Sequence, residues 1–342
     1  MNFSEFPDLM LSSNIPPLVI SDVTGNHVVV SIVIDHVTVF EEKLYPYDGK
    51  IEMQDLTTII TPYVHDKRKV LLQIAVADDN GGHEDVAYCD VIYCAADVDC
   101  SAEEFLENNF LTLLDGMKLT AHDRGELLSM VGTDDVKAIC YYDDDSREVF
   151  PLTAATESNG YRSFDVSPKR FEQGGKLLSG YVIVAGKRVM SYEVMDEALT
   201  DPAIVFENSF GVPETLYCVG TKTTESKFER SAVRVHGVKR NYNIEETRSF
   251  KCDTGFMRMS QQNWADDVMR SKDVALIKNV DGVWARGKAI VITDSNTACS
   301  NDDDAIFRVS FTYELAQRNH NVFSTTKSAG EIFDETFDSS FD

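Results

Sequence analysis

Apolar and polar residues alternate along most of the chain, which predicts β-strands rather than helices. The clearest alternation covers residues 307–315, where every second side chain is apolar and Arg, Ser, Thr and Glu lie between them. A period of two places one set of side chains in a core and the other in water. The same kind of pattern predicts strands over residues 28–34, 71–77, 86–93, 136–142, 181–185, 188–194, 274–278 and 283–293.

Short turn signals separate these strands. Asp48-Gly49, Asn159-Gly160, Gly186-Lys187 and Asp281-Gly282 each contain a glycine, which adopts a positive φ without steric cost. Such a pair between two alternating stretches is typical of a hairpin. We therefore expect hairpins at Asn159-Gly160 and Gly186-Lys187 in particular.

Only short helices are predicted. Residues 53–64 suit one helix that ends at Thr61-Pro62, because the residue before a proline disfavours the helical conformation. Ser101 with Glu104 three residues later is a capping box that begins a second helix. A further helix is predicted over 260–270, with Ser260 as its N-cap. The fold class is therefore mainly β, with two or three β-sandwich modules of Ig-like or Greek-key type and one or two short helices.

Composition and turn positions divide the chain into five parts. These are an N-terminal arm (1–16), a β-sandwich domain (17–96), a second β module (97–197), a third β module with helix 260–270 (198–325) and a C-terminal docking tail (326–342). The N-terminal arm is either a disordered leader or a segment packed on a neighbour. Glu107–Phe110 and Glu207–Phe210 are similar, which indicates either two copies of one β unit or a chance likeness.

The charge balance narrows the classes of partner. The 342 residues include 32 basic and 57 acidic side chains, a net charge of -25. Such a surface repels phosphate backbones and anionic membranes, so we expect neither a nucleic-acid nor a membrane partner. The N-terminus lacks the basic stretch of a signal peptide, which predicts synthesis in the cytoplasm without standard export. The seven cysteines show no CxxC spacing and are interpreted as reduced, buried side chains.

Motifs that would carry chemistry are missing from the sequence. It contains no G-x-S-x-G nucleophile elbow and no HExxH metal signature. Residues 282–288 have the G-x4-G-K spacing of a phosphate loop, but Ala289 replaces the Ser or Thr that binds Mg²⁺, and the stretch lies on a predicted hairpin. We predict no enzyme activity, no catalytic residues, no cofactor and no metal site.

Two alternatives remain open for exposed polar and aromatic groups. The acidic clusters are either solvated turn tips or oxygen ligands for Ca²⁺. They lie at residues 78–79, 84–85, 97–99, 143–145 and 302–304. Tyr45, Tyr47 and Tyr161 either pack in turns and cores or stack on sugar rings.

The last residues carry the strongest sign of partner binding. Phe333, Phe337 and Phe341 are each followed by an aspartate, and Ile332 precedes them. A spacing of four places the three rings on one face of a helix or of a strand. We predict Ile332, Phe333, Phe337 and Phe341 as partner-binding residues, which dock on their own domain or on a neighbouring subunit. A disordered tail is the third interpretation.

Three segments resemble a known family. They are the terminal GEIFDETFDSSFD, FENSFGVPETLYCVG at 206–220, and the stretch from Trp264 through 292–295 to 309–313. These segments are similar to tail- or baseplate-associated structural proteins of tailed phages and prophages of Bacteroidetes. The likeness is good over roughly residues 203–342 and loose over residues 1–95. The resemblance implies a virion component built of β-sandwich modules, arranged in rings around a tail axis, with no active site.

The expected function follows from these points together. We expect a non-enzymatic virion structural protein of a phage or prophage tail, made in the bacterial host cytoplasm, that assembles as an oligomeric ring. Its partners would be itself, as a homo-oligomer, and other tail proteins. The alternative is a carbohydrate-binding or adhesive β-sandwich protein, for which a glycan would be the partner.

Overall fold

The structure, a computed structural model, describes residues 2–79, 84–195, 202–280, 283–297 and 307–317. It confirms the mainly β fold class, with 56% strand, 11% helix and several sheets. The chain forms two compact units, and each is described by itself. The first comprises Met1–Ala198, Phe206–Thr215 and Arg258–Lys272, and the second comprises Leu199–Val205, Leu216–Met257 and Asp273–Asp342.

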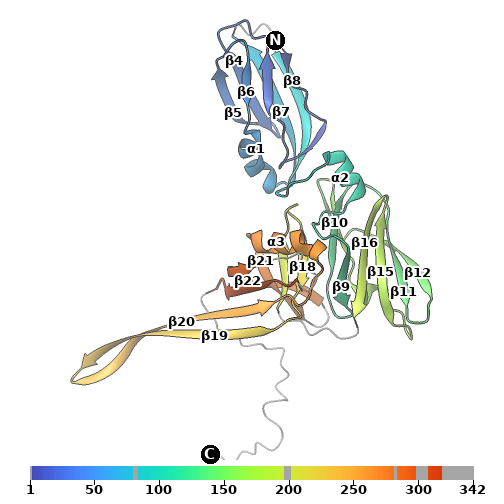
Figure 1. Ribbon diagram of the computed structural model, residues 1–342, viewed down its shortest axis with the longest axis vertical. Helices are drawn as coiled ribbons and strands as arrows, with labels where there is room; N and C mark the ends of the chain where they lie inside the picture. Colours follow the sequence, from blue (N-terminus) through green and yellow to red (C-terminus); the bar gives the residue numbers. More distant parts are fainter. Residues whose placement is uncertain (1, 80–83, 196–201, 281–282, 298–306, 318–342) are drawn as a thin grey trace, which may run out of the picture. The chain divides into compact units, whose positions relative to one another are not determined.

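The N-terminal part of the first unit contains two sheets and a helix (Figure 1). A five-stranded sheet has the order β2 (Leu9–Leu11), β8 (Glu84–Ile92), β7 (Lys69–Asp78), β4 (Val28–Ile34) and β5 (Val37–Leu44). A three-stranded sheet has the order β1 (Asn2–Phe3), β3 (Leu18–Ser21) and β6 (Ile51–Met53). Leu18, Ile32 and Leu72 are fully buried in the shared core, to which α1 (Leu56–His65) contributes Leu56, Ile60 and Val64.

Two predictions for this part are wrong. The N-terminal arm is neither a disordered leader nor a segment packed on a neighbour over residues 2–11. Instead β1 pairs with β3 and β2 pairs in parallel with β8, because Leu9–Leu11 adds an apolar strand at the β8 edge and buries Met10 and Leu11. Helix α1 does not end at Thr61-Pro62 but continues to His65, since burial of Val64 offsets the cost of an internal proline.

The remainder of the first unit repeats this pattern of sheets. A five-stranded sheet has the order β12 (Arg147–Leu152), β11 (Val136–Tyr142), β15 (Leu178–Ala185), β16 (Arg188–Met195) and β9 (Met117–Ala121). A three-stranded sheet has the order β10 (Leu127–Val131), β14 (Tyr161–Asp165) and β13 (Thr156–Ser158). Tyr181 of β15 and Tyr192 of β16 are buried and stack on each other, with ring centroids 4.6 Å apart. The predicted hairpins are confirmed: Asn159 and Gly160 both have positive φ, and Gly186 begins the turn between β15 and β16.

Two further helices and two 3₁₀ turns complete the described part of this unit. Ser101 caps α2 (Ala102–Asn108) as predicted, because its Oγ accepts a hydrogen bond from the Glu104 amide at 3.1 Å. Helix α3 (Gln262–Arg270) follows the 3₁₀ turn η2 (Met259–Gln261), so the predicted N-cap at Ser260 is wrong. A second 3₁₀ turn, η1, spans Pro168–Phe171. Trp264 and Val268 are both buried on α3.

One seven-stranded sheet accounts for most of the second unit. Its order is β18 (Pro213–Tyr217), β17 (Ala203–Glu207), β21 (Val274–Val280), β22 (Val283–Asn296), β23 (Ser310–Leu315), β20 (Val238–Asp253) and β19 (Lys222–Val235). The alternation over 307–315 is confirmed, because Phe307, Val309, Phe311, Tyr313 and Leu315 are buried. The regular strand starts only at Ser310, while Phe307 makes a single bridge to Met257.

The two similar motifs lie in different kinds of element. Glu107 and Asn108 end helix α2, whereas Glu207 ends strand β17. They are therefore not two copies of one β unit. Asn208 donates to the Leu111 carbonyl at 2.8 Å, and Phe210 stacks on Phe105, so the second motif packs against residues that flank the first.

Candidate functional site

The predicted partner-binding residues Ile332, Phe333, Phe337 and Phe341 lie outside the described residues, so they stay a prediction. The acidic cluster at 302–304 also lies outside them. Elsewhere in the described ranges, no group of three or more His, Cys, Asp or Glu side chains is placed to hold a metal ion. Residues 283–289 of the G-x4-G-K stretch lie on strand β22. No described helix is long and apolar enough to cross a membrane.

The three tyrosines considered for sugar stacking differ in exposure. Tyr161 is buried and donates to the Arg68 carbonyl at 2.9 Å, which excludes it as a surface platform. Tyr45 and Tyr47 are 72% and 89% exposed in the turn between β5 and β6. The Tyr45 ring lies 5.8 Å from the His27 ring.

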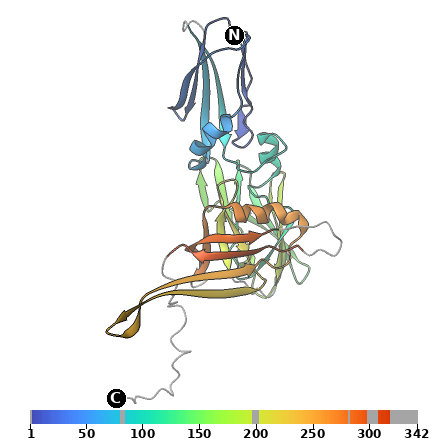
Figure 2. The ribbon, with the colours of Figure 1, turned by 60° about the vertical axis from the view of Figure 1, so that its left-hand side comes forward.

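Strands β19 and β20 of the second unit form a two-stranded ribbon that is mostly exposed. β20 pairs with β23 only through Ser249–Asp253, and β19 is the last strand of the sheet. Residues 226–235 and 238–248 therefore pair with each other alone, as Figures 1 and 2 show. We call residues 226–248 the arm. At about 3.3 Å per residue it extends roughly 33 Å beyond the paired part of β20.

A tight turn closes the arm. Val235 pairs with Val238, and the two residues between them, His236 and Gly237, have φ of 50° and 80°. Two successive positive φ values match the right-handed twist of the flanking strands. Tyr242 is left without a partner at a bulge opposite Ser231 and Ala232, and it is 72% exposed.

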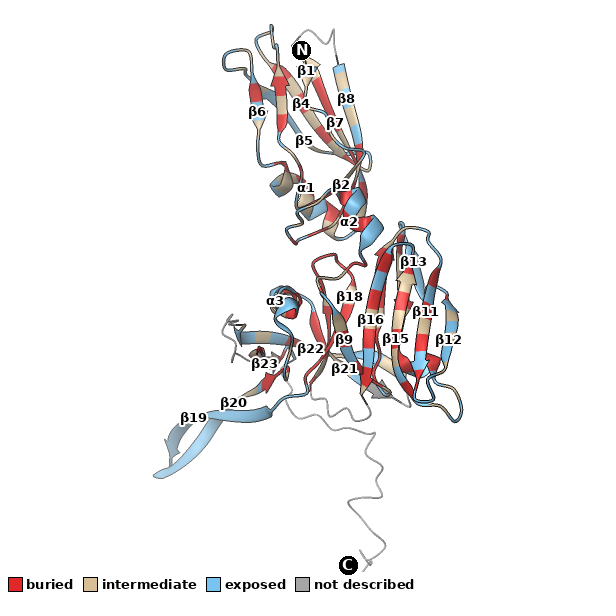
Figure 3. Cartoon of the chain, turned by 45° about the vertical axis from the view of Figure 1, so that its right-hand side comes forward, coloured by how far each residue is buried: buried red, intermediate tan, exposed pale blue. Residues whose placement is uncertain are grey.

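Both faces of the arm are exposed (Figure 3). Every residue of β19 is exposed, and so is every residue of β20 from Val238 to Glu245. These two stretches include several large apolar side chains. They are Phe228, Val233, Val235, Val238, Tyr242 and Ile244. An isolated hairpin is only marginally stable in water, and apolar side chains on both of its faces gain nothing there. A surface that covered these side chains would therefore stabilise the arm.

The charge of the arm is opposite to that of the chain. Residues 226–248 carry six Lys or Arg and three Glu, whereas the rest of the chain carries 26 basic and 54 acidic side chains. Ion pairs at its base join Lys227 to Glu229 at 2.9 Å and Arg248 to Glu246 at 2.7 Å. Arg234, Lys239 and Arg240 near the turn form no ion pair with any acid that the structure describes. Arg234 lies directly opposite Lys239, where like charges destabilise a strand pair.

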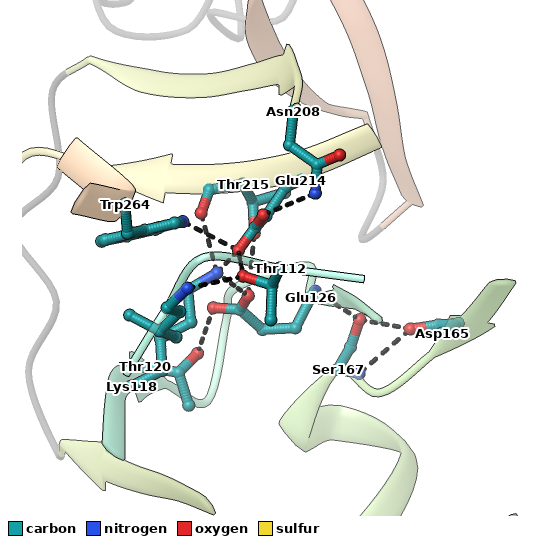
Figure 4. A network of polar contacts seen from close by, with 11 residues as sticks. Thr112, Lys118, Thr120, Glu126, Asp165, Ser167, Asn208, Glu214, Thr215 and Trp264 are labelled. Carbon is teal, nitrogen blue, oxygen red and sulfur yellow. Dashed lines mark hydrogen bonds and ion pairs between the residues drawn. The ribbon is translucent and has the colours of Figure 1, made fainter. Parts of the chain in front are cut away.

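The first unit contains a cluster of charged and polar side chains that are mostly buried and hydrogen-bonded to each other. We call it the buried polar network (Figure 4). Its members are Thr112, Lys118, Thr120, Glu126, Asn208, Glu214, Thr215 and Trp264. Lys118 Nζ donates to Glu126 Oε2 at 2.7 Å, and to the carbonyl and hydroxyl oxygens of Thr215 at 2.7 and 3.1 Å. These bonds use all three ammonium protons.

The second carboxylate of the network is held just as completely. Glu214 Oε1 accepts from Thr112 Oγ1 and Trp264 Nε1, each at 2.8 Å, and Oε2 accepts from Asn208 Nδ2 at 2.9 Å. Burial raises the pKa of Glu214, although Lys118, Asn208 and Thr112 act in the opposite direction. Thr120 and Thr215 donate to the two oxygens of Glu126. Because these donors and acceptors already bind each other, the network acts as a cross-link within the unit.

A smaller polar contact adds a second link to α3, beside the one that Trp264 makes. Asp267 accepts from Ser209 Oγ at 2.6 Å and from the Ser209 amide at 3.1 Å. Burial raises the pKa of Asp267 despite these hydrogen bonds. The segment 206–215 is thereby joined both to α3 and to the strands around Lys118.

Neither region was predicted from the sequence. For the arm, a usable signal is the alternation of Val233, Val235 and Val238 around His236-Gly237, which is a two-residue hairpin pattern. For the network there is no local signal, because Lys118 and Thr215 are 97 residues apart. No protein-family model matches the chain, and a search of curated proteins finds no match.

Proposed function

We propose that this chain is a non-enzymatic structural protein of a phage or prophage tail, which assembles with copies of itself and with other tail proteins. The single observation that supports assembly best is the arm. It carries exposed apolar side chains on both faces and, near its turn, cations that have no acidic partner among the residues the structure describes, and a partner that covered it would stabilise it.

The buried polar network supports the non-enzymatic part of the proposal. Lys118 and Glu214 are the kind of side chains that catalysis uses, but each is already bound by protein donors or acceptors. Their role in the fold accounts for their burial. The resemblance of residues 206–220 and 330–342 to phage tail proteins supplies the virion setting of the proposal.

Sedimentation of the purified full chain over a range of concentrations tests assembly. We expect concentration-dependent oligomers, and rings by electron microscopy. A chain that stays monomeric at every concentration, alone and with purified tail proteins of the same phage, would overturn the proposal.

The predicted contribution of the C-terminal tail has its own test. Deletion of residues 331–342, or the length-preserving variant F333S/F337S/F341S, should leave a folded chain with weaker assembly, because the apolar anchors are lost. Equal assembly by both variants and the unaltered chain would remove these residues from the interface.

The exposed tyrosine pair favours one second candidate, a glycan-binding protein. Tyr45 and Tyr47 both project into solvent from one turn, which is a geometry that sugar rings stack on. A glycan array separates the two functions: a specific sugar signal that Tyr47→Ala abolishes would favour glycan binding, and the assembly proposal expects none.

A further inference from the structure

We propose that the arm docks on the acidic surface of a second copy of this chain, in a head-to-tail contact. This inference rests on the proposed assembly function and identifies the partner of the arm. The charge of the arm differs from that of the rest of the molecule. The arm has three more basic than acidic side chains, and the remaining residues have 28 more acidic than basic ones.

Charge complementarity decides which surface of the second copy receives the arm. Two arms that met each other would bring cations together, with Arg234 already opposite Lys239 in each. An arm placed on the body of another copy instead brings Arg234, Lys239 and Arg240 near carboxylates. The contact therefore joins two different surfaces, which is a heterologous contact that closes into a ring or continues as a stack.

The apolar side chains of the arm argue for a protein surface. Val233, Val235 and Val238 surround the turn and Ile244 lies further along, and all four are between 44% and 56% exposed. These side chains gain from contact with another apolar surface, which a phosphate backbone lacks. The net charge of -25 also opposes the approach of a nucleic acid.

The arm can be altered without altering the fold. Its distal side chains are exposed, and none of them is among the buried residues that the structure describes. We expect the charge-reversed variant R234E/K239E/R240E to stay folded, with an association constant about 10- to 100-fold lower than that of the unaltered chain. The measurement is sedimentation velocity at low and at physiological salt.

A matched control separates local charge from net charge. Lys43, Lys137 and Lys169 are exposed on the first unit and lie outside the arm, and K43E/K137E/K169E changes the net charge by the same amount. This variant should associate within about threefold of the unaltered chain, because screening weakens charge effects beyond a Debye length. Equal losses in the two variants would overturn the inference.

Mixing distinguishes head-to-tail docking from other contacts. A charge-reversed copy cannot donate its arm, but it still offers its acidic surface to an unaltered copy. An equimolar mixture should therefore form mixed complexes. If the charge-reversed chain associates neither with itself nor with the unaltered chain, the contact is not head-to-tail and the inference fails.

Carbodiimide cross-linking of a mixture of ¹⁴N- and ¹⁵N-labelled chains locates the contact. We expect Lys239 to be linked to Asp or Glu residues outside the arm on a chain of the other isotope. Links confined to one isotope would overturn the inference. So would tighter binding of a short DNA duplex than of a second copy, which would assign the arm to nucleic acid.

Two results distinguish a failure of this inference from a failure of the proposed function. If the unaltered chain assembles and R234E/K239E/R240E assembles equally well, the arm inference fails while the assembly function stands. If the unaltered chain never assembles, the proposed function itself fails.

Discussion

The buried polar network and the arm hold their charges in opposite ways. In the network, Lys118 donates to three acceptors and each oxygen of Glu126 and Glu214 accepts at least one hydrogen bond. In the arm, Arg234, Lys239 and Arg240 have no acidic partner within the described ranges. A buried charge must be paired inside the fold, because water is not there to solvate it. An exposed charge can stay unpaired in the free chain and serve a contact with another molecule.

The two regions should also differ in their effects, because the network contributes to stability and the arm to assembly. The network joins residues 112–126 to residues 208–215 and to α3, so its loss should destabilise the first unit. The arm is attached to its sheet only through Ser249–Asp253, so changes near its turn should leave both units intact.

Lys118→Met should lower the free energy of unfolding by about 3–5 kcal/mol, because it leaves the buried Glu126 carboxylate without its cation. Urea denaturation followed by far-UV circular dichroism measures this. Lys43→Met, at an exposed position, is the control and should change stability by less than about 0.5 kcal/mol. A loss below about 1 kcal/mol for Lys118→Met would show that the network is not the cross-link described above.

Asp267→Ala should cost about 2–3 kcal/mol, because the amide and hydroxyl of Ser209 both lose a buried acceptor. Ser209→Ala removes the hydroxyl but keeps the hydrogen bond from the backbone amide of residue 209 to Asp267, so it should cost about 1 kcal/mol. Equilibrium denaturation of both variants gives the comparison. Equal losses would mean that the hydrogen bond from the Ser209 amide to Asp267 adds nothing to stability.

His65 provides a pH-dependent contact at the surface of the first unit. Partial burial lowers the pKa of His65, but hydrogen bonds with Asp66 and with Glu207 outweigh it and raise the pKa above the ordinary value of 6.5. The protonated ring, 2.9 Å from Glu207, therefore stabilises the fold below pH 6.5. That contribution is lost as the pH rises through the pKa of the folded state.

The effect should stay below about 1 kcal/mol, because the His65 side chain is 42% exposed and screened by solvent. Unfolding of the unaltered chain and of His65→Asn at pH 5.5 to 8 measures it. The variant should show a flatter pH dependence. If both curves fall in parallel, the titrating group lies elsewhere.

Lys239→Glu should stabilise the arm by about 0.5 kcal/mol, because it replaces a like-charge pair with Arg234 by an opposite-charge pair. Hydrogen exchange of the amides in residues 226–248 should slow. Lys239→Gln removes the repulsion without adding attraction and should give a smaller gain. The same Lys239→Glu change should weaken self-association, and an arm that exchanges faster would contradict the pairing described here.

Local patterns explain why much of the fold was predictable. The alternation over 136–142 and the Asn159-Gly160 pair each specify their own strand or turn, and both were confirmed. Predictions failed where distant contacts outweighed local preference. Helix α1 continues through Pro62 because Val64 packs in the core, and residues 9–11 join the β8 edge, which no local pattern specifies.

The candidate site was not predictable for the same reason. The sequence contains Val233, Val235 and Val238 in a pattern that normally means one buried face, yet the structure exposes both faces of that ribbon. Burial depends on what covers a strand, and the pattern of a single strand does not contain that information.

The amino-acid sequence alone specifies the mainly β class, the strands and turns of several hairpins and the strongly negative net charge. These follow from side-chain periodicity, glycine positions and charge, which are local or additive properties. Which charges meet depends on the tertiary fold. It placed Lys118 against Thr215 across 97 residues of chain and left Arg234 and Lys239 opposite each other in solvent. Long-range packing sets such distances, and distance and burial together determine whether a charge is paired or free.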